Sequence, residues 1–454
     1  MTETVLLVGG GGREHAIARA VDAGDATLYA CAGNRNPGIA ALADGFETLD
    51  TTTPQAVVAY AEEVGATLAV VGPETPLEAG VADALVDSGV YAFGPTADTA
   101  RIETDKAYQR RFMREHGISG CPAFETFDDT ERACEFVEEH GEGWVVKPAG
   151  LTGGKGVRVI GDQVTPQEAI EYLQDADYDR IVVEERLVGE EFTVQALVAN
   201  GDVRVTPAVQ DHKRAYEGDE GPNTGGMGSY SDSEATLPFM DRADYDAAIG
   251  IVEETVAALD GYTGVLYGQF MLTAEGPKVV EFNARFGDPE AMNVLPVLDT
   301  DFVSVLTAGR DGESLPDLDF ADRATVCKYA VPDGYPDDPT AGAKVNVDES
   351  AIEEINERFA DEGDSVAADG GRSPEAMLFY ASVDERDDGV YTTTSRAFAV
   401  VGLADDISTA EEVVEETLAY AGTEGLRVRH DIGTADLVES RVEHMDELRD
   451  ASGH

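Results

Sequence analysis

Residues 279–290 read VVEFNARFGDPE, and this stretch is the most informative part of the chain. Its first half is predicted to be a β-strand, in which alternate side chains point to one face, so Glu281 and Asn283 should lie side by side. A carboxylate beside an amide oxygen suits a hard cation such as Mg²⁺. Arg285 falls on the same face and could hold a carboxylate or a phosphate through two parallel hydrogen bonds.

The strand that precedes this stretch strengthens the interpretation. Residues 267–272 and 278–282 alternate in polarity and are predicted to form an antiparallel pair. Gln269, on the first of these strands, could add a third oxygen to those of Glu281 and Asn283. The hairpin is therefore predicted to bind Mg²⁺ or Mn²⁺.

A glycine-rich segment, KPAGLTGGKGV at 147–157, lies between predicted strands at 144–147 and 157–160. It differs from the loop of P-loop nucleotide-binding proteins, because the Lys-Ser/Thr pair and the following helix are missing. Glycines let backbone N–H groups approach phosphate, and Lys147 and Lys155 would neutralise its charge. We therefore expect a flexible hairpin over a triphosphate; the alternative is an ordinary glycine hairpin with solvent-exposed lysines.

The first hundred residues alternate short apolar strands with helical segments. Strands are predicted at 4–8, 26–32, 68–71 and 91–93, and helices at 13–23 and 80–88. This alternation is typical of a doubly wound parallel sheet. The turn after the first strand reads GGGGREH at 9–15, and backbone N–H groups at the start of a helix bind anions.

That glycine-rich turn does not complete a dinucleotide site. Such a site expects an acidic residue at the end of the second strand, and this strand ends in ACAGN at 30–34. Binding of a sugar phosphate fits the turn better. The alternative is a tight turn that packs the helix against the strand.

Two further segments carry weaker signals. VVEERLVGEEF at 182–192 is predicted to be two strands joined by an acidic turn, whose carboxylates could accept hydrogen bonds from an adenine amine or from ribose hydroxyls. QDHKR at 210–214 contains two adjacent cations, which is unusual in this chain, and GPNTGGMG at 221–228 predicts a long loop around a small ligand. The alternative is a charged turn followed by an ordinary loop.

The charge balance restricts the setting of the protein. The 454 residues include 90 acidic and 32 basic ones, which gives a formal net charge of −58. Nucleic-acid binding is not expected, because no basic stripe exists to release counterions. No apolar run is long enough for a membrane helix, and the N-terminus looks like a first strand and not like a signal peptide. We expect a cytoplasmic protein from a cell that keeps molar salt in its cytoplasm, since salt would screen the acidic surface.

The segments VGGGGREHA, VVGPETPL, VVKPAGLTGGKGV, QDHKRAYEGDEGPNTGGMGSYS and VEFNARFGDPE resemble, in this order and spacing, the ATP-grasp superfamily and within it the phosphoribosylamine–glycine ligase family. The resemblance is close over about residues 1–310 and looser beyond, where the chain looks closer to an archaeal branch. It implies a multidomain protein of α/β and α+β class, with a parallel α/β substrate domain, an ATP-grasp core with a small lid, and a C-terminal mixed α/β domain.

Domain bounds follow from the predicted elements and the resemblance together. We expect the substrate domain at 1–105, the ATP-grasp domain at 106–321 with its lid at about 124–190, and the C-terminal domain at 322–436. The remaining residues, 437–454, look like a frayed acidic helix.

The resemblance also implies an activity and the roles of residues. ATP would activate glycine as glycyl phosphate, which 5-phosphoribosylamine would then attack. Catalytic roles fall to Asp211, Lys213 and Arg285. The residues implied to bind ATP are Lys106, Lys147, Lys155, Glu184, Glu185, Leu187 and Glu191. The implied metal ligands are Gln269, Glu281 and Asn283. The implied substrate-binding residues are Gly10, Gly11, Gly12, Arg13, Glu14, Gly225, Gly226, Met227, Asp288, Pro289 and Glu290.

Other functions remain as alternatives. Another ATP-grasp carboxylate–amine ligase, or a purine-pathway carboxylase, would share the lysines and the Glu-x-Asn strand but should lack QDHKR and GPNTGGMG together. A dehydrogenase built on the first domain would need the missing ribose-binding acid. An inactive nucleotide sensor is disfavoured by the presence of Lys147, Lys155, Glu281 and Asn283. We expect a monomer or a weak dimer.

Overall fold

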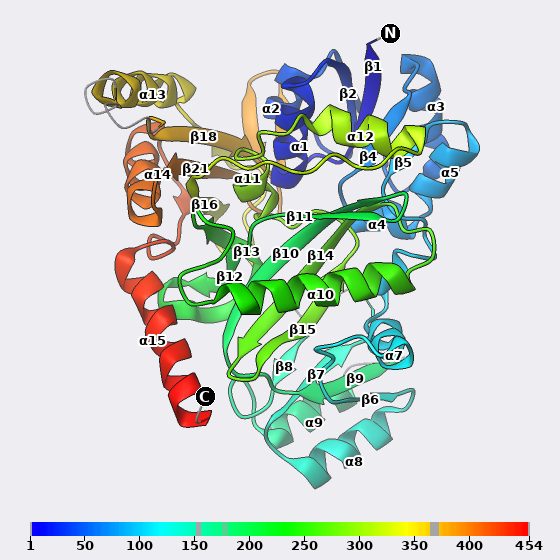
Figure 1. The fold of residues 1–454 in the computed structure, drawn as a ribbon. Helices are drawn as coiled ribbons and strands as arrows, with labels where there is room; N and C mark the ends of the chain where they lie inside the picture. The colour runs from blue at the N-terminus through cyan, green and yellow to red at the C-terminus, as the bar shows by residue number, and fades with distance from the viewer. Residues whose placement is uncertain (1, 151–155, 176–177, 179, 364–371, 453–454) are drawn as a thin grey trace.

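The computed structural model describes residues 2–150, 156–175, 178, 180–363 and 372–452 (Figure 1). Its N-terminal part is a parallel sheet with the strand order β3-β2-β1-β4-β5. The strands are β1 (Glu3–Val8), β2 (Ala26–Ala32), β3 (Gly45–Thr48), β4 (Leu68–Val71) and β5 (Tyr91–Phe93). The helices are α1 (Gly12–Asp22), α2 (Pro37–Leu42), α3 (Pro54–Val64), α4 (Glu74–Glu78) and α5 (Val81–Asp87). The predicted doubly wound parallel sheet is confirmed.

The order of these strands positions the glycine-rich turn. The direction of winding changes between β1 and β4, and the carboxyl ends of two such strands open a crevice in sheets of this kind. The turn at 9–12 follows β1, and the turn that leads into α4 follows β4. Both turns therefore lie at the edge of the sheet where ligands usually bind.

A second sheet lies in the middle of the molecule and is antiparallel throughout, with the order β11-β10-β14-β15. Its strands are β10 (Glu190–Ala199), β11 (Asp202–Val205), β14 (Gly264–Thr273) and β15 (Gly276–Asn283). Helix α10 (Arg242–Ala258) packs along one face of this sheet, as Figure 1 shows. The short helix α6 (Arg101–Thr104) and helix α7 (Lys106–His116) connect it to the N-terminal part. The predicted hairpin of 267–272 and 278–282 is confirmed as β14 and β15.

A third, smaller sheet with the order β6-β9-β7-β8 forms the lower end of the molecule in Figure 1. Its strands are β6 (Phe124–Phe127), β7 (Trp144–Pro148), β8 (Arg158–Val159) and β9 (Ile181–Glu185). Helices α8 (Thr130–His140) and α9 (Pro166–Asp175) cover it and share a small apolar core with its strands. The glycine-rich segment lies between β7 and β8, and its residues 151–155, including Lys155, are outside the described part of the chain.

The C-terminal sheet includes a segment that was expected to be a loop. Its order is β12-β13-β16-β21-β18, with β22 paired to β16. The strands are β12 (Gln210–Tyr216), β13 (Glu220–Ser231), β16 (Ala324–Pro332), β18 (Glu375–Tyr380), β21 (Phe398–Ala404) and β22 (Leu426–Arg427). The long loop predicted at 221–228 is thus wrong, because this segment is part of β13. Glycine serves close strand packing here, since a Cβ at Gly228 would lie 2.2 Å from the carbonyl oxygen of Cys327 on β16.

Other elements of the C-terminal part surround this sheet. A small sheet with the order β17-β20-β19 consists of β17 (Lys344–Val345), β19 (Val383–Arg386) and β20 (Gly389–Thr392). The helices are α11 (Ala291–Val294), α12 (Phe302–Asp311), α13 (Glu349–Gly363) and α14 (Ile407–Ala421), and η1 (Glu217–Asp219) is a single 3₁₀ turn. Within the described ranges, no helix is long and apolar enough to cross a membrane.

The last helix, α15 (Ala435–Ser452), also differs from the expectation of a frayed acidic tail. Met445 is fully buried, and Leu437, Val438 and Val442 pack against the main core. Arg449 forms a 2.7 Å ion pair with Asp244 on α10. The helix is therefore docked, because apolar residues on one side of it are covered even though its overall composition is acidic.

Candidate active site

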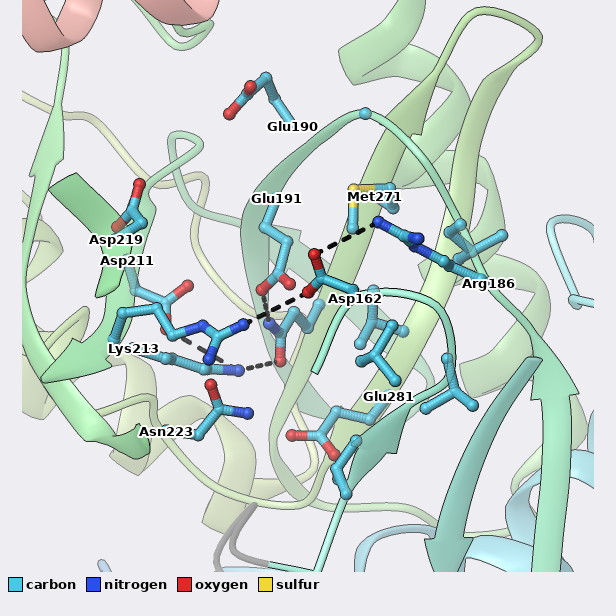
Figure 2. Close-up of a pocket in the computed structure, with 18 of the residues that line it drawn as sticks. Asp162, Arg186, Glu190, Glu191, Asp211, Lys213, Asp219, Asn223, Met271 and Glu281 are labelled. Atoms are coloured by element: carbon cyan, nitrogen blue, oxygen red, sulfur yellow. Dashed lines mark hydrogen bonds and ion pairs between the residues drawn. The ribbon is translucent and has the colours of Figure 1, made fainter. Parts of the chain in front are cut away.

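A cavity of about 450 Å³ lies between the small sheet β6-β9-β7-β8 and the central sheet (Figure 2). One part of its wall is apolar and comes from Val145, Val157, Val159, Leu187, Met271 and Val280. The predicted site residues that line it are Lys147, Glu184, Glu185, Leu187, Glu191, Asp211, Lys213, Gln269 and Glu281. Residues far apart in the sequence are thus brought together around a space large enough for a nucleotide.

The predicted metal ligands occupy the β14–β15 hairpin. Gln269 and Glu281 are directly opposite each other in the antiparallel register, and Asn283 is two residues beyond Glu281, so it lies on the same face. The Glu281 carboxylate forms an ion pair with Lys106 Nζ at 3.3 Å. Burial alone would raise the pKa of Glu281, but the positive charges of Lys106 and Lys213 lower it well below its usual range. This carboxylate is therefore ionised at neutral pH.

Gln269 was predicted to be a metal ligand, but both polar atoms of its side chain already have hydrogen-bond partners. Its side-chain oxygen accepts a 2.5 Å hydrogen bond from Lys213 Nζ, and its side-chain nitrogen donates to Glu191 at 2.6 Å. Lys213 also lies 3.8 Å from Asp211. The side chains of Asp211, Lys213, Gln269 and Glu191 form one chain of contacts across the cavity wall.

Asp211 is the unusual member of this group. Its side chain is almost fully buried, and among the described residues its Oδ1 atom has no hydrogen-bond partner. Burial raises the pKa of Asp211 to about 6, although the nearby Lys213 opposes this shift. A carboxyl group with such a pKa can exchange a proton near neutral pH.

Glu184 and Lys147 form a buried ion cluster with Arg110, a residue that sequence reasoning missed. Glu184 is within 2.8 Å of Arg110 Nε and also pairs with Lys147 Nζ. Burial raises the pKa of Glu184, but the charges of Arg110 and Lys147 outweigh this and lower it. The carboxylate of Glu184 is therefore ionised and paired with two cations, Arg110 and Lys147. Glu185 accepts a hydrogen bond from the amide of Ala123 at 3.0 Å.

Arg285 lies outside the cavity wall and connects the hairpin to the N-terminal part. Its guanidinium is 3.1 Å from a carboxylate oxygen of Glu103 and 3.7 Å from one of Glu74. Its Nε atom is buried and, within the described part of the chain, has no hydrogen-bond partner. Burial would lower the pKa of Arg285, but the two carboxylates raise it, so the group stays charged.

The glycine-rich turn after β1 is stabilised by its own side chains. Glu14 accepts a hydrogen bond from the amide of Gly11 at 2.7 Å and one from Arg13 Nε at 2.6 Å. Arg13 Nη1 donates to the carbonyl of Phe286 at 2.9 Å. A Cβ at Gly12 would lie 2.3 Å from the Tyr329 hydroxyl. The turn that was predicted to bind an anion is thus also a packing element.

The remaining predicted substrate residues meet at one place. Arg396 Nη1 donates to the carbonyls of Gly225 at 2.7 Å and Gly226 at 3.1 Å, and its Nη2 pairs with Asp288 at 3.0 Å. The Tyr329 hydroxyl donates to Asp288 at 2.5 Å. A Cβ at Gly11 would lie only 3.8 Å from this carboxylate, so the glycine turn is adjacent.

Gly226, Met227 and Glu290 are all buried. A Cβ at Gly226 would lie 2.6 Å from the Pro289 ring, Glu290 accepts from the Tyr267 hydroxyl at 2.8 Å, and Met227 is fully buried. Arg396 and Tyr329 come from the C-terminal sheet region, and sequence reasoning missed both. An arginine in a chain with few basic residues was the available signal.

Two antiparallel sheets enclosing a cavity with lysines and acidic residues define the class of the protein as an ATP-grasp enzyme, and comparison with known families agrees. The model of the phosphoribosylglycinamide synthetase ATP-grasp (A) domain matches residues 104–291. Models of the N domain and the C domain of the same synthetase match residues 3–103 and 325–435. The chain belongs to the phosphoribosylamine–glycine ligase family.

Individual relatives support this assignment. A phosphoribosylamine–glycine ligase of Methanococcoides burtonii is 50% identical over 456 residues, with 98% of this chain and 99% of the relative covered. That of Methanothermobacter thermautotrophicus is 47% identical with the same coverage. The crystal structure of the Thermotoga maritima ligase has a TM-score of 0.76 at 26% identity and covers 94% of this chain and 99% of its own.

A more distant structure shares the fold alone. An ADP complex of N5-carboxyaminoimidazole ribonucleotide synthetase has a TM-score of 0.66 at 14% identity, covering 93% of this chain and 98% of its own. The similarity to the phosphoribosylamine–glycine ligases is higher in both identity and TM-score. The resemblance stated from the sequence is thus confirmed, and the carboxylase alternative is not favoured.

Proposed function

We propose that this protein joins glycine to 5-phosphoribosylamine with the hydrolysis of ATP to ADP and phosphate, giving glycinamide ribonucleotide for purine biosynthesis. The observation that carries the proposal is the match of the N, ATP-grasp and C domain models in order along one chain. The site fits this reaction, because phosphoryl transfer needs positioning and charge stabilisation more than a protein nucleophile.

The cavity supplies an environment suited to ATP. The base would lie against the apolar wall near Leu187 and Met271. Lys147, which lines the cavity, and Lys106, which reaches Glu281, would hold the phosphates. Lys155 is assigned the same role from the sequence resemblance. Glu184 would act through Lys147 and Arg110, since its carboxylate is already paired with both.

The chemistry of the hairpin side chains fits a divalent cation. Glu281 is ionised and half-buried beside cations, and Asn283 offers an amide oxygen on the same face, so the two suit Mg²⁺ or Mn²⁺. We propose these two as ligands in preference to Gln269, whose oxygen is occupied by Lys213. A metal bound there would neutralise phosphate charge during transfer.

The two chemical steps use different groups. A carboxylate oxygen of glycine attacks the γ-phosphorus and ADP leaves, with Lys213 and Arg285 stabilising the negative charge. The amine nitrogen of 5-phosphoribosylamine then attacks the acyl carbon, and inorganic phosphate leaves. The nitrogen must lose a proton in this step. We assign its acceptor as Asp211, because the free Oδ1 atom and the pKa of about 6 suit that role.

The sugar-phosphate end would lie where the glycine turn meets the Asp288 region. The phosphate suits the backbone amides of Gly10 and Gly12 at the start of α1. The Asp288 carboxylate, held by Arg396 and Tyr329, suits ribose hydroxyls. The remaining residues proposed to shape this end are Gly11, Arg13, Glu14, Gly225, Gly226, Met227, Pro289 and Glu290.

The protein is further proposed to work in the setting expected from its composition. The net charge of −58 supports a cytoplasm with molar salt and argues against nucleic-acid partners. We also propose a monomer or weak dimer, and the division into 1–105, 106–321 with a lid at about 124–190, 322–436 and 437–454. Strands β12 and β13 join the C-terminal sheet, so the second and third of these units share one sheet.

The test is release of ADP in molar KCl with ATP and Mg²⁺. We expect ADP only when both glycine and freshly generated 5-phosphoribosylamine are present. Release of ADP with another carboxylate, and none with glycine, would contradict the substrate assignment while keeping ATP-grasp chemistry. Nucleotide binding without turnover on any carboxylate would contradict the enzymatic assignment and favour a sensor.

A further inference from the structure

The peptide unit between Gly10 and Gly11 is held at both of its ends. Its carbonyl oxygen accepts hydrogen bonds from Nδ2 of Asn34 at 3.1 Å and from Nδ2 of Asn36 at 3.2 Å. Its amide nitrogen donates to the Glu14 carboxylate at 2.7 Å. A peptide unit is planar, and the C=O and N–H groups of a trans unit point in opposite directions, so these contacts fix the plane of the unit. The conformation of the glycine-rich turn is therefore set by side chains that follow it in the sequence.

The same two asparagines also hold the C-terminal part of the chain. Asn36 Nδ2 donates to the carbonyl of Tyr380 at 2.8 Å and to that of Ala381 at 3.0 Å. Asn34 Nδ2 donates to the carbonyl of Val383 at 2.7 Å. These acceptors lie at the end of β18 and the start of β19, and Figure 1 shows α1 and α2 next to β18. The glycine turn and this C-terminal segment therefore share one set of hydrogen-bond donors.

The orientation of the Asn36 side chain follows from its own contacts. The side chain is fully buried, and its Oδ1 atom accepts hydrogen bonds from the amides of Gly38 at 3.0 Å and Ile39 at 3.2 Å at the start of α2. These two donors identify the oxygen end of the side-chain amide, so the nitrogen, which carries two hydrogens, faces the three carbonyl groups. Capping of α2 thus uses the oxygen alone, and the nitrogen serves the glycine turn and the C-terminal segment.

Two amides of the turn have no partner in this arrangement. Gly10 and Gly12 are buried, and among the described residues neither of their amide nitrogens donates a hydrogen bond. An unpaired buried N–H group costs free energy, and N–H groups at the start of a helix suit an anion.

We propose that Asn36, together with Asn34, is a positioning residue for the sugar phosphate of the substrate. A carbonyl oxygen carries partial negative charge and would repel a phosphate. The two asparagines hold the Gly10 carbonyl toward the C-terminal segment, so that the amides of Gly10 and Gly12 face the phosphate and this carbonyl does not. The site is thus assembled where the N-terminal and C-terminal parts meet. This inference rests on the sugar-phosphate site of the proposed function.

The test measures binding of ribose 5-phosphate, a stable compound that keeps the sugar phosphate and lacks the amine, to the full-length protein in molar KCl. Calorimetry gives its Kd and that of ADP. The variants are Asn36→Ser, in which the serine oxygen can still cap α2, and Asn34→Ala. The control is Arg35→Met, which removes a 3.0 Å ion pair with Glu385 at the same contact and leaves the donors to the Gly10 carbonyl in place. Thermal melting checks that each variant is folded.

We expect both asparagine variants to raise the Kd of ribose 5-phosphate about tenfold, as for a weakened hydrogen bond to a charged group, and to leave the Kd of ADP unchanged. The KM for 5-phosphoribosylamine should rise by a similar factor, while kcat and the KM values for ATP and glycine stay the same. Arg35→Met should leave ribose 5-phosphate binding intact. Wild-type affinity for ribose 5-phosphate in the folded asparagine variants, or an equal loss in Arg35→Met, would overturn the inference.

The Asn34 variant keeps the test decisive if Asn36→Ser fails to fold, since Asn34 is only half-buried and donates to the same carbonyl. The Kd measurements need no ligase turnover. A protein that binds ribose 5-phosphate through these asparagines but does not ligate glycine would contradict the proposed function and support the positioning role. A wild-type protein that does not bind ribose 5-phosphate would overturn the inference, and release of ADP with glycine and 5-phosphoribosylamine would still support the proposed function.

Discussion

Lys106 Nζ, at the start of α7, lies 3.3 Å from the Glu281 carboxylate on β15. This contact joins the connecting helix to the hairpin that carries the proposed metal ligands. It also places a cation beside the carboxylate, which keeps that group ionised. A bound metal would therefore meet the negative charge of Glu281, and a triphosphate would meet the positive charge of Lys106.

The variant Glu281→Gln should remove the charge of this ligand with little change in shape. We expect kcat to fall by roughly 10²-fold or more, because a group that stabilises charge in the transition state is lost. The Mg²⁺ concentration needed for half-maximal activity should rise. Steady-state ADP release over a Mg²⁺ titration measures both quantities.

The control for this variant is Glu275→Gln, in the turn of the same hairpin. Glu275 is exposed, so its replacement should leave kcat and the Mg²⁺ dependence unchanged. Wild-type activity and Mg²⁺ dependence in Glu281→Gln would show that Glu281 does not bind the metal.

Arg285 balances the buried carboxylate of Glu103 and the half-exposed carboxylate of Glu74. The variant Arg285→Met should lower the free energy of unfolding by about 3 kcal/mol, since it leaves the buried carboxylate of Glu103 without its cation. The double variant Arg285→Met, Glu103→Gln should recover part of this loss. Denaturant unfolding in molar KCl gives the comparison.

A matched surface pair serves as the reference for that experiment. Arg242 and Asp246 form a largely exposed ion pair on α10, and Arg242→Met should have no measurable effect on stability. Equal losses of unfolding free energy in Arg285→Met and Arg242→Met would mean that burial of the Arg285 ion pair contributes nothing to stability.

Asp211 predicts the acidic limb of the pH profile. Burial raises its pKa to about 6, so the carboxylate is ionised above this pH and protonated below it. A proton acceptor must be ionised, and kcat/KM should therefore rise with pH through about 6 and level off above. The variant Asp211→Asn should have low activity and no limb at this pH. A wild-type profile that is flat between pH 5 and about 7 would contradict the assignment.

The acidic surface predicts a strong dependence of stability on salt. At a net charge of −58, repulsion between carboxylates should lower the melting temperature in dilute buffer, and KCl at about 1 M reduces the Debye length to about 3 Å. The melting temperature should rise steadily from about 0.1 M to about 3 M KCl. Sorbitol at equal osmolality is the control, because it does not screen charge. Equal melting temperatures in low and high salt would rule out screening as the stabilising effect.

Local periodicity was sufficient to predict much of the scaffold. The strands at 26–32, 68–71 and 91–93 were predicted with the bounds that the structure has, and the predicted helix at 13–23 differs from α1 by one residue at each end. These segments have apolar patterns that repeat every two or about four residues, or are short and entirely apolar, and such patterns are visible without knowledge of the partner. The β14–β15 hairpin was predictable for the same reason, since both of its strands and their turn are consecutive.

The sequence by itself therefore determined the class of the protein, its parallel and ATP-grasp sheets, and nine of the residues that line the cavity. Only the tertiary structure decided which charges pair. In a chain with 90 acidic residues, no local signal distinguishes Glu184, paired with Arg110, from a surface glutamate. The placement of Arg441 and His444 beside Glu190 was equally hidden, because about 250 residues separate them and such contacts depend on packing between distant elements.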